Sequence, residues 1–201
     1  MEIFNTFFGL LIVFAGFFLC LSVHEFAHAY VSNLLGDPTA KHDGRISLNP
    51  LAHIDIFGTV ILPLILIISG LPAFGWAKPV YVNIYNFKNP ALGNFLTAFA
   101  GPIANFSFAI IISLLIAIFP QLSFLIILIQ INVVLGIFNL IPIPPLDGSK
   151  IWHLVLSDEI YFTLERFGPF ILIAVLLLSG GIGNSLFGIV NTVSYYIVNL
   201  F

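Results

Sequence analysis

Long apolar runs restrict what this chain can fold into more than any other feature of its sequence. Several of them approach the roughly 20 residues that cross a bilayer as a helix. Hydrophobic residues make up 60% of the chain and charged residues 7%, whereas soluble domains carry about a quarter charged residues. We therefore predict an all-α polytopic membrane protein with about five spanning helices, built as a single integral-membrane domain over residues 1–201. The predicted helices cover residues 3–35, 91–119, 122–140, 160–179 and 184–201.

Two shorter segments lie between the first two predicted helices. Residues 58–70 are apolar, but as a helix they cover only about 20 Å, so we expect a re-entrant segment or a short sixth helix. Residues 80–85 alternate aliphatic with larger, polar-tipped side chains at a period of two, which predicts a strand. We therefore expect a small β-strand or hairpin element near the functional site.

Charge and cysteine content exclude some classes of partner. Six Lys and Arg residues form no patch large enough to hold nucleic acid. The single cysteine, Cys20, excludes an intramolecular disulfide. Residues 1–23 lack a basic first part and a small-residue cleavage site, so we expect a retained helix rather than a signal peptide. The expected surroundings are the lipid bilayer, and the sequence gives no oligomeric state.

Two histidines and a glutamate stand in the last third of the first predicted helix. His24 and His28 are four residues apart, so their rings project from one helix face about one turn apart. That spacing suits two ligands of one tetrahedral metal ion, for which Zn²⁺ is the usual occupant. Glu25 would face a water on that metal and could take its proton. His-Glu-x-x-His on a helix is a signature of zinc peptidases that work in this way.

A zinc site of this kind needs a third protein ligand and an open position. Asp147 follows three prolines in a stretch of four residues and precedes Gly148. Pro142 must break or unwind the helix before it. A carboxylate at a broken helix end within a membrane needs a partner, and a metal is the best one available. We predict Asp147 as the third ligand; the alternative is an N-cap or turn residue in a water-exposed loop.

With these residues the chain resembles the site-2 protease family of intramembrane zinc metalloproteases, as a minimal member. The resemblance implies that His24, His28 and Asp147 bind one zinc ion per chain and that Glu25 is the catalytic base. The implied function is hydrolysis of peptide bonds in or near transmembrane segments of membrane-protein or peptide substrates. The chain departs from the family pattern at Ile56, where Pro is expected after His-Ile-Asp. The segments that carry the resemblance are residues 24–29, 49–55, 101–105 and 139–148.

The placement of charges predicts how the chain lies in the membrane. If Asp147 meets the two histidines, the first helix and the 122–140 helix end at the same face. The last two predicted helices then form a hairpin that returns to that face. All six Lys and Arg residues would lie near it, and the opposite turns carry none. By the positive-inside rule the site faces the cytoplasm and the N-terminus lies outside, in a multi-pass protein of the plasma membrane.

Other polar residues have two interpretations each. Asn105 and Asn139 lie in apolar helices, so each either bridges helices or contacts the substrate and its oxyanion; bridging is favoured for Asn105. His53 could orient a metal ligand from behind, although a structural hydrogen bond is favoured. The predicted strand either pairs with an extended substrate or forms an interfacial loop. Its substrate-contacting residues would be Val80, Val82 and Ile84.

Two functions from other classes compete with hydrolysis. A metal transporter would also bury His and Asp, but it usually needs polar residues along a path across the whole bilayer, whereas the charges here crowd one face. A non-catalytic membrane adaptor is disfavoured, because the proposed base and all three proposed ligands are present.

Overall fold

The computed structural model describes residues 2–70, 78–178 and 182–201, and this part of the chain is helical, with no strand. The described helices are α1 (Glu2–Leu34), α2 (Thr39–His42), η1 (Pro50–His53), η2 (Ile56–Ile61), α3 (Leu62–Ile68), η3 (Ile84–Asn86), α4 (Pro90–Ile118), η4 (Pro120–Leu125), α5 (Ile126–Asn139), η5 (Asp147–Leu154), α6 (Asp158–Leu178) and α7 (Ile182–Val198). Of the η elements, η2 is a π-helix and the others are 3₁₀-helices.

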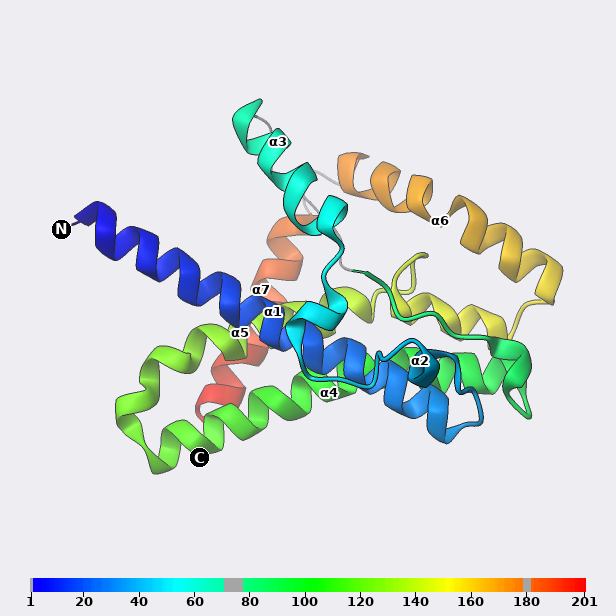
Figure 1. Cartoon of the computed structure of the whole chain (residues 1–201), viewed down its shortest axis with the longest axis horizontal. Helices are drawn as coiled ribbons and strands as arrows, with labels where there is room; N and C mark the ends of the chain where they lie inside the picture. The colour runs from blue at the N-terminus through cyan, green and yellow to red at the C-terminus, as the bar shows by residue number, and fades with distance from the viewer. Residues whose placement is uncertain (1, 71–77, 179–181) are drawn as a thin grey trace.

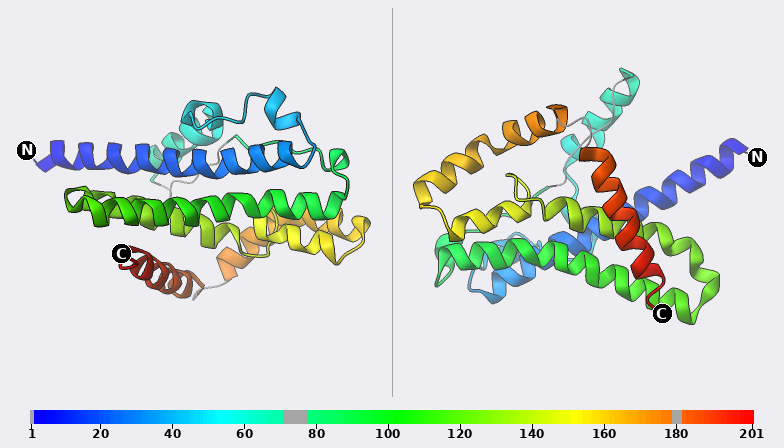
Figure 2. Two further views of the ribbon diagram at one scale, coloured as in Figure 1. Left: turned by 90° about the horizontal axis from the view of Figure 1, so that it is seen from below. Right: turned by 180° about the vertical axis from the view of Figure 1, so that it is seen from behind.

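Helices α1, α4 and α5 form the centre of the molecule, with α4 antiparallel to both neighbours (Figure 1, Figure 2). Between α4, α5 and α7 the packing is apolar, and Ile112, Ile129 and Val133 are buried there. Helix α1 joins this core through Cys20. Helix α1 therefore packs on α4 and α5 from about Cys20 onward, which fixes the part of α1 that carries the His-Glu-x-x-His motif.

Local sequence signals set the helix ends that matter for the site. Asn89 caps α4 by accepting a backbone N–H of the first turn, and Pro90 is the first helical residue. Gly36, with φ 110°, follows the end of α1. Helix α5 ends at Asn139, and the proline segment that follows cannot continue it. The chain therefore turns before η5 begins at Asp147.

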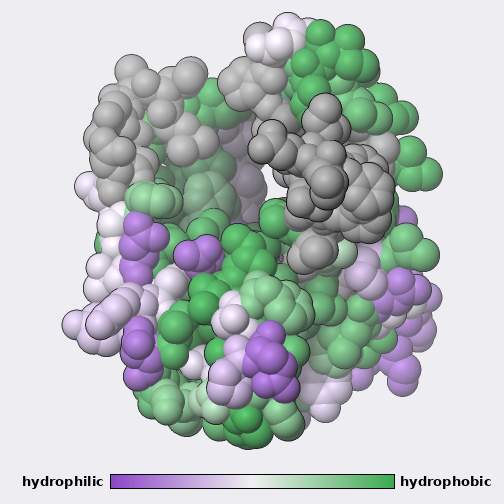
Figure 3. Space-filling model, turned by 90° about the vertical axis from the view of Figure 1, so that its left-hand side faces the viewer, coloured by the Kyte–Doolittle hydropathy of each residue, from purple (hydrophilic) through white to green (hydrophobic). Residues whose placement is uncertain are grey.

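Three described helical segments are long and apolar enough to cross a membrane: Val13–Leu34, Pro90–Ile118 and Pro120–Asn139. The prediction of about five spanning helices is thus confirmed for three. Helix α6 carries four charged residues in its first half, and the apolar parts Ile56–Ile68 and Ser185–Val198 are shorter. Figure 3 views the molecule along its long axis, and hydrophobic residues cover much of the coloured surface there, with hydrophilic residues between them.

The predicted strand over residues 80–85 is not confirmed. Residues 78–83 form no regular element, and residues 84–86 form the 3₁₀-helix η3. Alternation at period two gave the right local extension for 80–83, but a strand also needs a paired neighbour, and none lies beside this segment in the described ranges. The rest of the expected hairpin, residues 71–77, lies outside the described residues.

The positions of α3, α6 and α7 also differ from those expected for an up-and-down bundle. Helix α3 projects away from the central helices with its side chains exposed (Figure 1). The Ser113 hydroxyl near the far end of α4 donates to the carbonyl oxygen of Ile197 (2.6 Å). The end of α7 therefore lies at the face opposite the motif, and the predicted hairpin that returns to the motif's face is wrong. Charged residues early in α6 keep its first half near the motif's face.

Asp37 connects the end of α1 to the segment that precedes α4. Its side chain is fully buried and accepts hydrogen bonds from Thr39 (N–H 3.1 Å, hydroxyl 2.6 Å), the Asn83 N–H (2.8 Å) and the Asn86 amide (2.7 Å). Burial alone would raise the pKa of Asp37, but these hydrogen bonds hold it below its usual value. The carboxylate thereby anchors residues 83–86 against α1.

We expect Asp37→Ala to lower the free energy of unfolding by about 2–4 kcal/mol, because it leaves buried donors without an acceptor. Thermal unfolding in detergent would measure this, with the exposed Asp43→Ala as the matched control. A depressed folded-state pKa gives stability that is present above the unfolded pKa and is lost as pH falls. The difference between the wild type and Asp37→Ala should therefore shrink below about pH 4. Equal losses in the two variants would contradict the anchor.

Candidate metal centre

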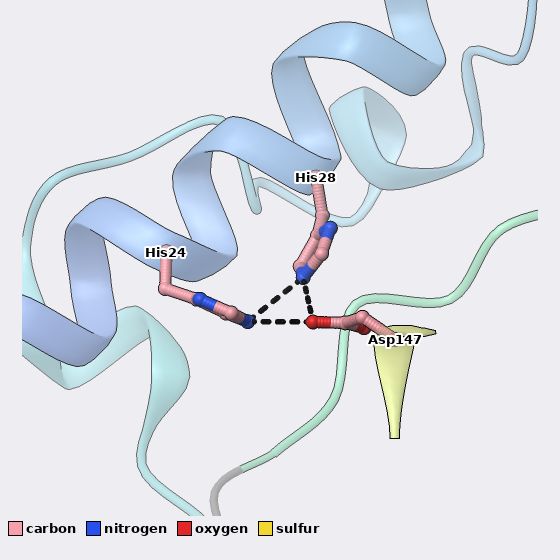
Figure 4. A group of neighbouring side chains, drawn as sticks. All are labelled: His24, His28 and Asp147. Carbon is pink, nitrogen blue, oxygen red and sulfur yellow. Dashed lines mark hydrogen bonds and ion pairs between the residues drawn. The ribbon is translucent and has the colours of Figure 1, made fainter. Parts of the chain in front are cut away.

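Helix α1 presents His24 and His28 toward η5, where Asp147 meets them (Figure 4). The two Nε2 atoms are 3.0 Å apart, and Asp147 Oδ2 lies 3.1 Å from His24 Nε2 and 3.4 Å from His28 Nε2. Ligand atoms bound to one tetrahedral zinc at about 2.0–2.1 Å stand about 3.3 Å from each other. The three atoms thus already have the spacing that one zinc ion requires.

Hydrogen bonds on the other side of each ring fix which nitrogen carries the proton. His24 Nδ1 is 2.6 Å from Asn105 Oδ1, and His28 Nδ1 is 2.7 Å from the carbonyl oxygen of Thr97. The amide nitrogen of Asn105 is already used, because it donates to the Cys20 carbonyl (3.2 Å) and to Asn132 Oδ1 (2.7 Å). Both partners of the rings are therefore acceptors, so each Nδ1 carries the hydrogen. Each Nε2 then offers a lone pair.

Three electron-rich atoms consequently converge on one point. Asp147 Oδ2 is buried and has no hydrogen-bond donor among the described residues. Lone pairs at these distances repel one another unless a cation lies between them. Two imidazole nitrogens and one carboxylate oxygen are a donor set that suits zinc.

Gly101 makes room for the two histidine rings. A Cβ atom at this position would lie 2.5 Å from His28 Nε2 and 2.7 Å from His24 Cε1. Those distances are far below any real contact, and the ring atoms involved belong to the converging group. Gly101 lies one helix turn before Asn105 on α4, so the same face of α4 both clears space for the rings and orients one of them.

A cavity of about 440 Å³ opens beside the three converging side chains. Glu25, half-buried, lines it next to His24. The extended segment 79–82 forms another wall, and Asn139 and Lys150 line it as well. The three converging residues and Glu25 thus share one space large enough for a segment of peptide.

The other residues singled out from the sequence fall into two groups. Val80, Val82 and Asn139 line the cavity, whereas Ile84 lines a second, neighbouring cavity. The Asn139 amide donates to the carbonyl of Leu135 in its own helix (3.0 Å), and its contact with substrate stays a prediction. Of the residues singled out from the sequence, Asn105 and His53 line neither cavity.

Asn105 and His53 have structural partners. Asn105 is fully buried and uses both ends of its amide to join α1, α4 and α5. Bridging, the favoured interpretation, is therefore what the structure shows, and the side chain does not reach the space where a substrate oxyanion would lie. His53 Nε2 is 2.8 Å from the Ser47 carbonyl oxygen, and the His53 carbonyl accepts the N–H of Lys78 (3.0 Å). These contacts order the loop after α2.

Sequence reasoning missed three residues of the site. Thr97 contributes through its backbone carbonyl, for which a sequence has no signal. Gly101 belongs to the segment 101–105 that carries the family resemblance, and its position one turn before Asn105 could have pointed to the histidines. Asn94, in the first turns of α4, lines both cavities. The sequence alone shows it only as a polar residue early in an apolar helix.

Comparisons with known proteins agree with this geometry. Residues 121–179 match Peptidase family M50. Over 143 residues the chain is 43% identical to "Putative zinc metalloprotease YwhC" of Bacillus subtilis, a match that covers 65% of this chain and 62% of that protein. It is 28% identical over 192 residues to "Putative zinc metalloprotease Rip2" of Mycolicibacterium smegmatis, covering 90% of this chain and 71% of that protein. The chain thus spans less than two thirds of the Bacillus protein. No solved structure matches.

We expect Gly101→Ala to reduce zinc affinity by about 10–100-fold, because the added methyl group must displace the ring atoms of His24 and His28. Metal content after dialysis against a zinc buffer, measured by mass spectrometry, would show this. Gly188→Ala is the matched control, since a Cβ there has no atom within 4 Å. Full zinc retention by Gly101→Ala would show that the histidine rings do not hold the metal in this arrangement.

Proposed function

We propose that the chain is an intramembrane zinc endopeptidase, a function supported by its similarity to Peptidase family M50 and to a protein named as a putative zinc metalloprotease. Its substrates would be membrane proteins, cut at peptide bonds in or near their transmembrane segments. The observation that carries the proposal is the convergence of His24, His28 and Asp147 beside Glu25, at one end of a bundle of membrane-length helices.

One zinc ion held by His24, His28 and Asp147 would polarise the scissile carbonyl and lower the pKa of a water to about 7. Glu25 lines the same cavity and in this proposal accepts a proton from the attacking water and passes it to the leaving nitrogen. Asn105 and the Thr97 carbonyl keep the two rings in the required tautomer throughout. In this proposal the zinc would polarise the carbonyl, and the protein orients the zinc ligands and transfers the proton.

A substrate helix must be drawn out before it can be cut, because its carbonyl groups are held in helical hydrogen bonds. The freed backbone groups then need partners, which lipid does not offer. Residues 79–82 supply an extended backbone along the cavity, and no described residue bonds to the N–H of Val80 or Val82. In an extended segment, neighbouring residues point their N–H groups to opposite edges, so the N–H of Asn83 lies on the edge opposite to those of Val80 and Val82. On that edge, Asn83 already donates to Asp37. Among the described residues, nothing pairs with this edge of segment 79–82, and we propose that an extended peptide does.

The arrangement favours hydrolysis over transport of the metal. Beyond Asn132, the core toward the far end of the bundle is mainly apolar, with Ala109, Ile112 and Leu128 buried between the helices, and the buried Ser113 hydroxyl there donates to the Ile197 carbonyl. A transport path would need polar side chains across this zone. The proposed orientation, with the site toward the cytoplasm and the N-terminus outside the plasma membrane, rests on the Lys and Arg residues near the motif's face.

We expect Glu25→Gln to keep zinc at the wild-type level and to lower cleavage by at least about 100-fold, because the amide cannot accept the proton. The measurement is a comparison, by mass spectrometry, of membrane-protein fragments from cells that produce the wild type, Glu25→Gln or the control Glu159→Gln at equal levels. Fragments that appear with the wild type and the control only would be the products. Identical fragment sets in all three cultures would sink the proposal.

We also expect Val82→Pro to lower cleavage of such a substrate by about tenfold or more, since proline removes the backbone donor at the free edge. Val82→Ala, which keeps the N–H and loses only part of the side chain, should stay within about threefold of the wild type. Rates are measured on the purified proteins after zinc content is shown to be equal. If both variants lose the same activity, the Val82 side chain contributes to cleavage and its backbone N–H does not, which would contradict pairing of the substrate with this edge.

A further inference from the structure

A second cavity of about 270 Å³ adjoins the first. The two cavities share Val82 and Asn94 in their walls, so these two residues lie between them. Segment 79–85 runs along both, with its first half on the metal side and its second half on the far side. The mechanism described above uses the first cavity only. The second cavity is lined by Val82, Asn83, Ile84, Tyr85, Asn94, Tyr161, Phe162 and Glu165.

The orientation of the Asn94 amide at the junction follows from its neighbours. His153 Nε2 lies 3.2 Å from Asp158 Oδ1, and a carboxylate only accepts, so this ring nitrogen carries the hydrogen. In the neutral ring, His153 Nδ1 must then accept, and it does so from Asn94 Nδ2 at 3.1 Å. The same Nδ2 donates to the Tyr161 hydroxyl at 3.0 Å. The His153 and Tyr161 rings are stacked, with centroids 4.1 Å apart.

Both hydrogens of the Asn94 amide are therefore used, and its oxygen is left over. No described residue donates to Asn94 Oδ1, and this atom is not among the buried atoms that lack a partner. Since Asn94 is 9% exposed and lines both cavities, its oxygen is open to the space where they meet. A rigidly held acceptor thus lines both cavities together with segment 79–85.

The charges around the junction compensate one another. Lys150 lines the first cavity and Glu165 the second, and the two form an ion pair at 2.7 Å. Glu165 also accepts from the Ser149 hydroxyl at 3.1 Å. With its carboxylate paired in this way, the second cavity is lined mainly by aliphatic and aromatic side chains. It suits an uncharged, apolar side chain rather than an acidic or basic one.

We infer that the second cavity is a substrate subsite and that Asn94 Oδ1 accepts one backbone N–H of the bound peptide. An extended peptide paired with segment 79–82 passes the junction, donates to Asn94, and places one apolar or aromatic side chain among Ile84, Tyr161 and Phe162. Asn94 thereby sets which residue of the substrate occupies the subsite. The inference rests on the proposed function, because it assumes that the peptide lies in the metal cavity.

The test uses the zinc-loaded full chain with Glu25→Gln, so that bound peptide is not cut. The probe is a fluorescein-labelled decapeptide of leucine and alanine, with each backbone amide replaced in turn by an ester, which removes one N–H. Dissociation constants are measured by fluorescence anisotropy in detergent. Esters opposite Val80 and Val82 weaken binding in every variant, because they face segment 79–82.

One further ester, the one that removes the backbone N–H donated to Asn94 Oδ1, should weaken binding about 5–10-fold when Asn94 is intact. Asn94→Leu, which has the same shape and no acceptor, should abolish that one effect, whereas Asn94→Asp, which keeps an acceptor, should retain it. Asn199→Ala, at an exposed residue near the C-terminus, is the control and should behave as the intact protein. Zinc content and thermal unfolding confirm that each variant is folded, and Asn94→Ala replaces Asn94→Leu if the latter is not.

The subsite is tested with the same probe. At the residue whose side chain enters the second cavity, leucine or phenylalanine should bind at least about tenfold more tightly than glutamate. An ester scan that is identical in intact protein and Asn94→Leu would overturn the inference while leaving the peptidase proposal intact. Absence of any peptide binding, in a protein that holds zinc, would count against both.

Discussion

The structure depends on three lone pairs that point at one another. Two imidazole nitrogens and a carboxylate oxygen lie 3.0 to 3.4 Å apart beside the larger cavity, an arrangement that is unfavourable without a cation. These atoms come from two helical segments separated by more than a hundred residues, so a metal ion held by them would join α1 to η5. The Gly101 surface of α4, against which both rings lie, is the third side of this arrangement.

A line of amides extends from the metal centre into the apolar interior. Asn105 contacts His24 on one side and Asn132 on the other, and Asn132 donates to Cys20 Sγ (3.0 Å) and to the Leu128 carbonyl (2.8 Å). In hydrocarbon such groups are costly unless every one of them is paired. This network therefore does two things with the same atoms: it sets the register of α1, α4 and α5, and it holds one imidazole in the tautomer that the metal needs.

The sequence predicted those parts whose signal is local or chemical. The ends of α1, α4 and α5 lie within a few residues of the predicted ones, because Gly36, Asn89 and the proline segment act on the backbone directly. Asp147 could be found because few acidic residues lie at a broken helix end. The prediction of a strand over 80–85 was not confirmed, because alternation is a property of one segment whereas a strand also requires a paired second segment. The course of α7 failed too, because nothing in its own residues says which face its C-terminal end reaches.

The chain's single cysteine is fully buried where α1 meets α5, and its thiol is 3.9 Å from the Leu128 carbonyl oxygen. Maleimide reagents should therefore leave the native protein unmodified while it is folded. Cysteines placed one at a time along segment 79–85 or on α6 can then be tagged with spin labels or fluorophores on an otherwise unaltered sequence. Replacing Cys20 first, as is customary before such labelling, would remove a partner of Asn132 and disturb the network that orients His24.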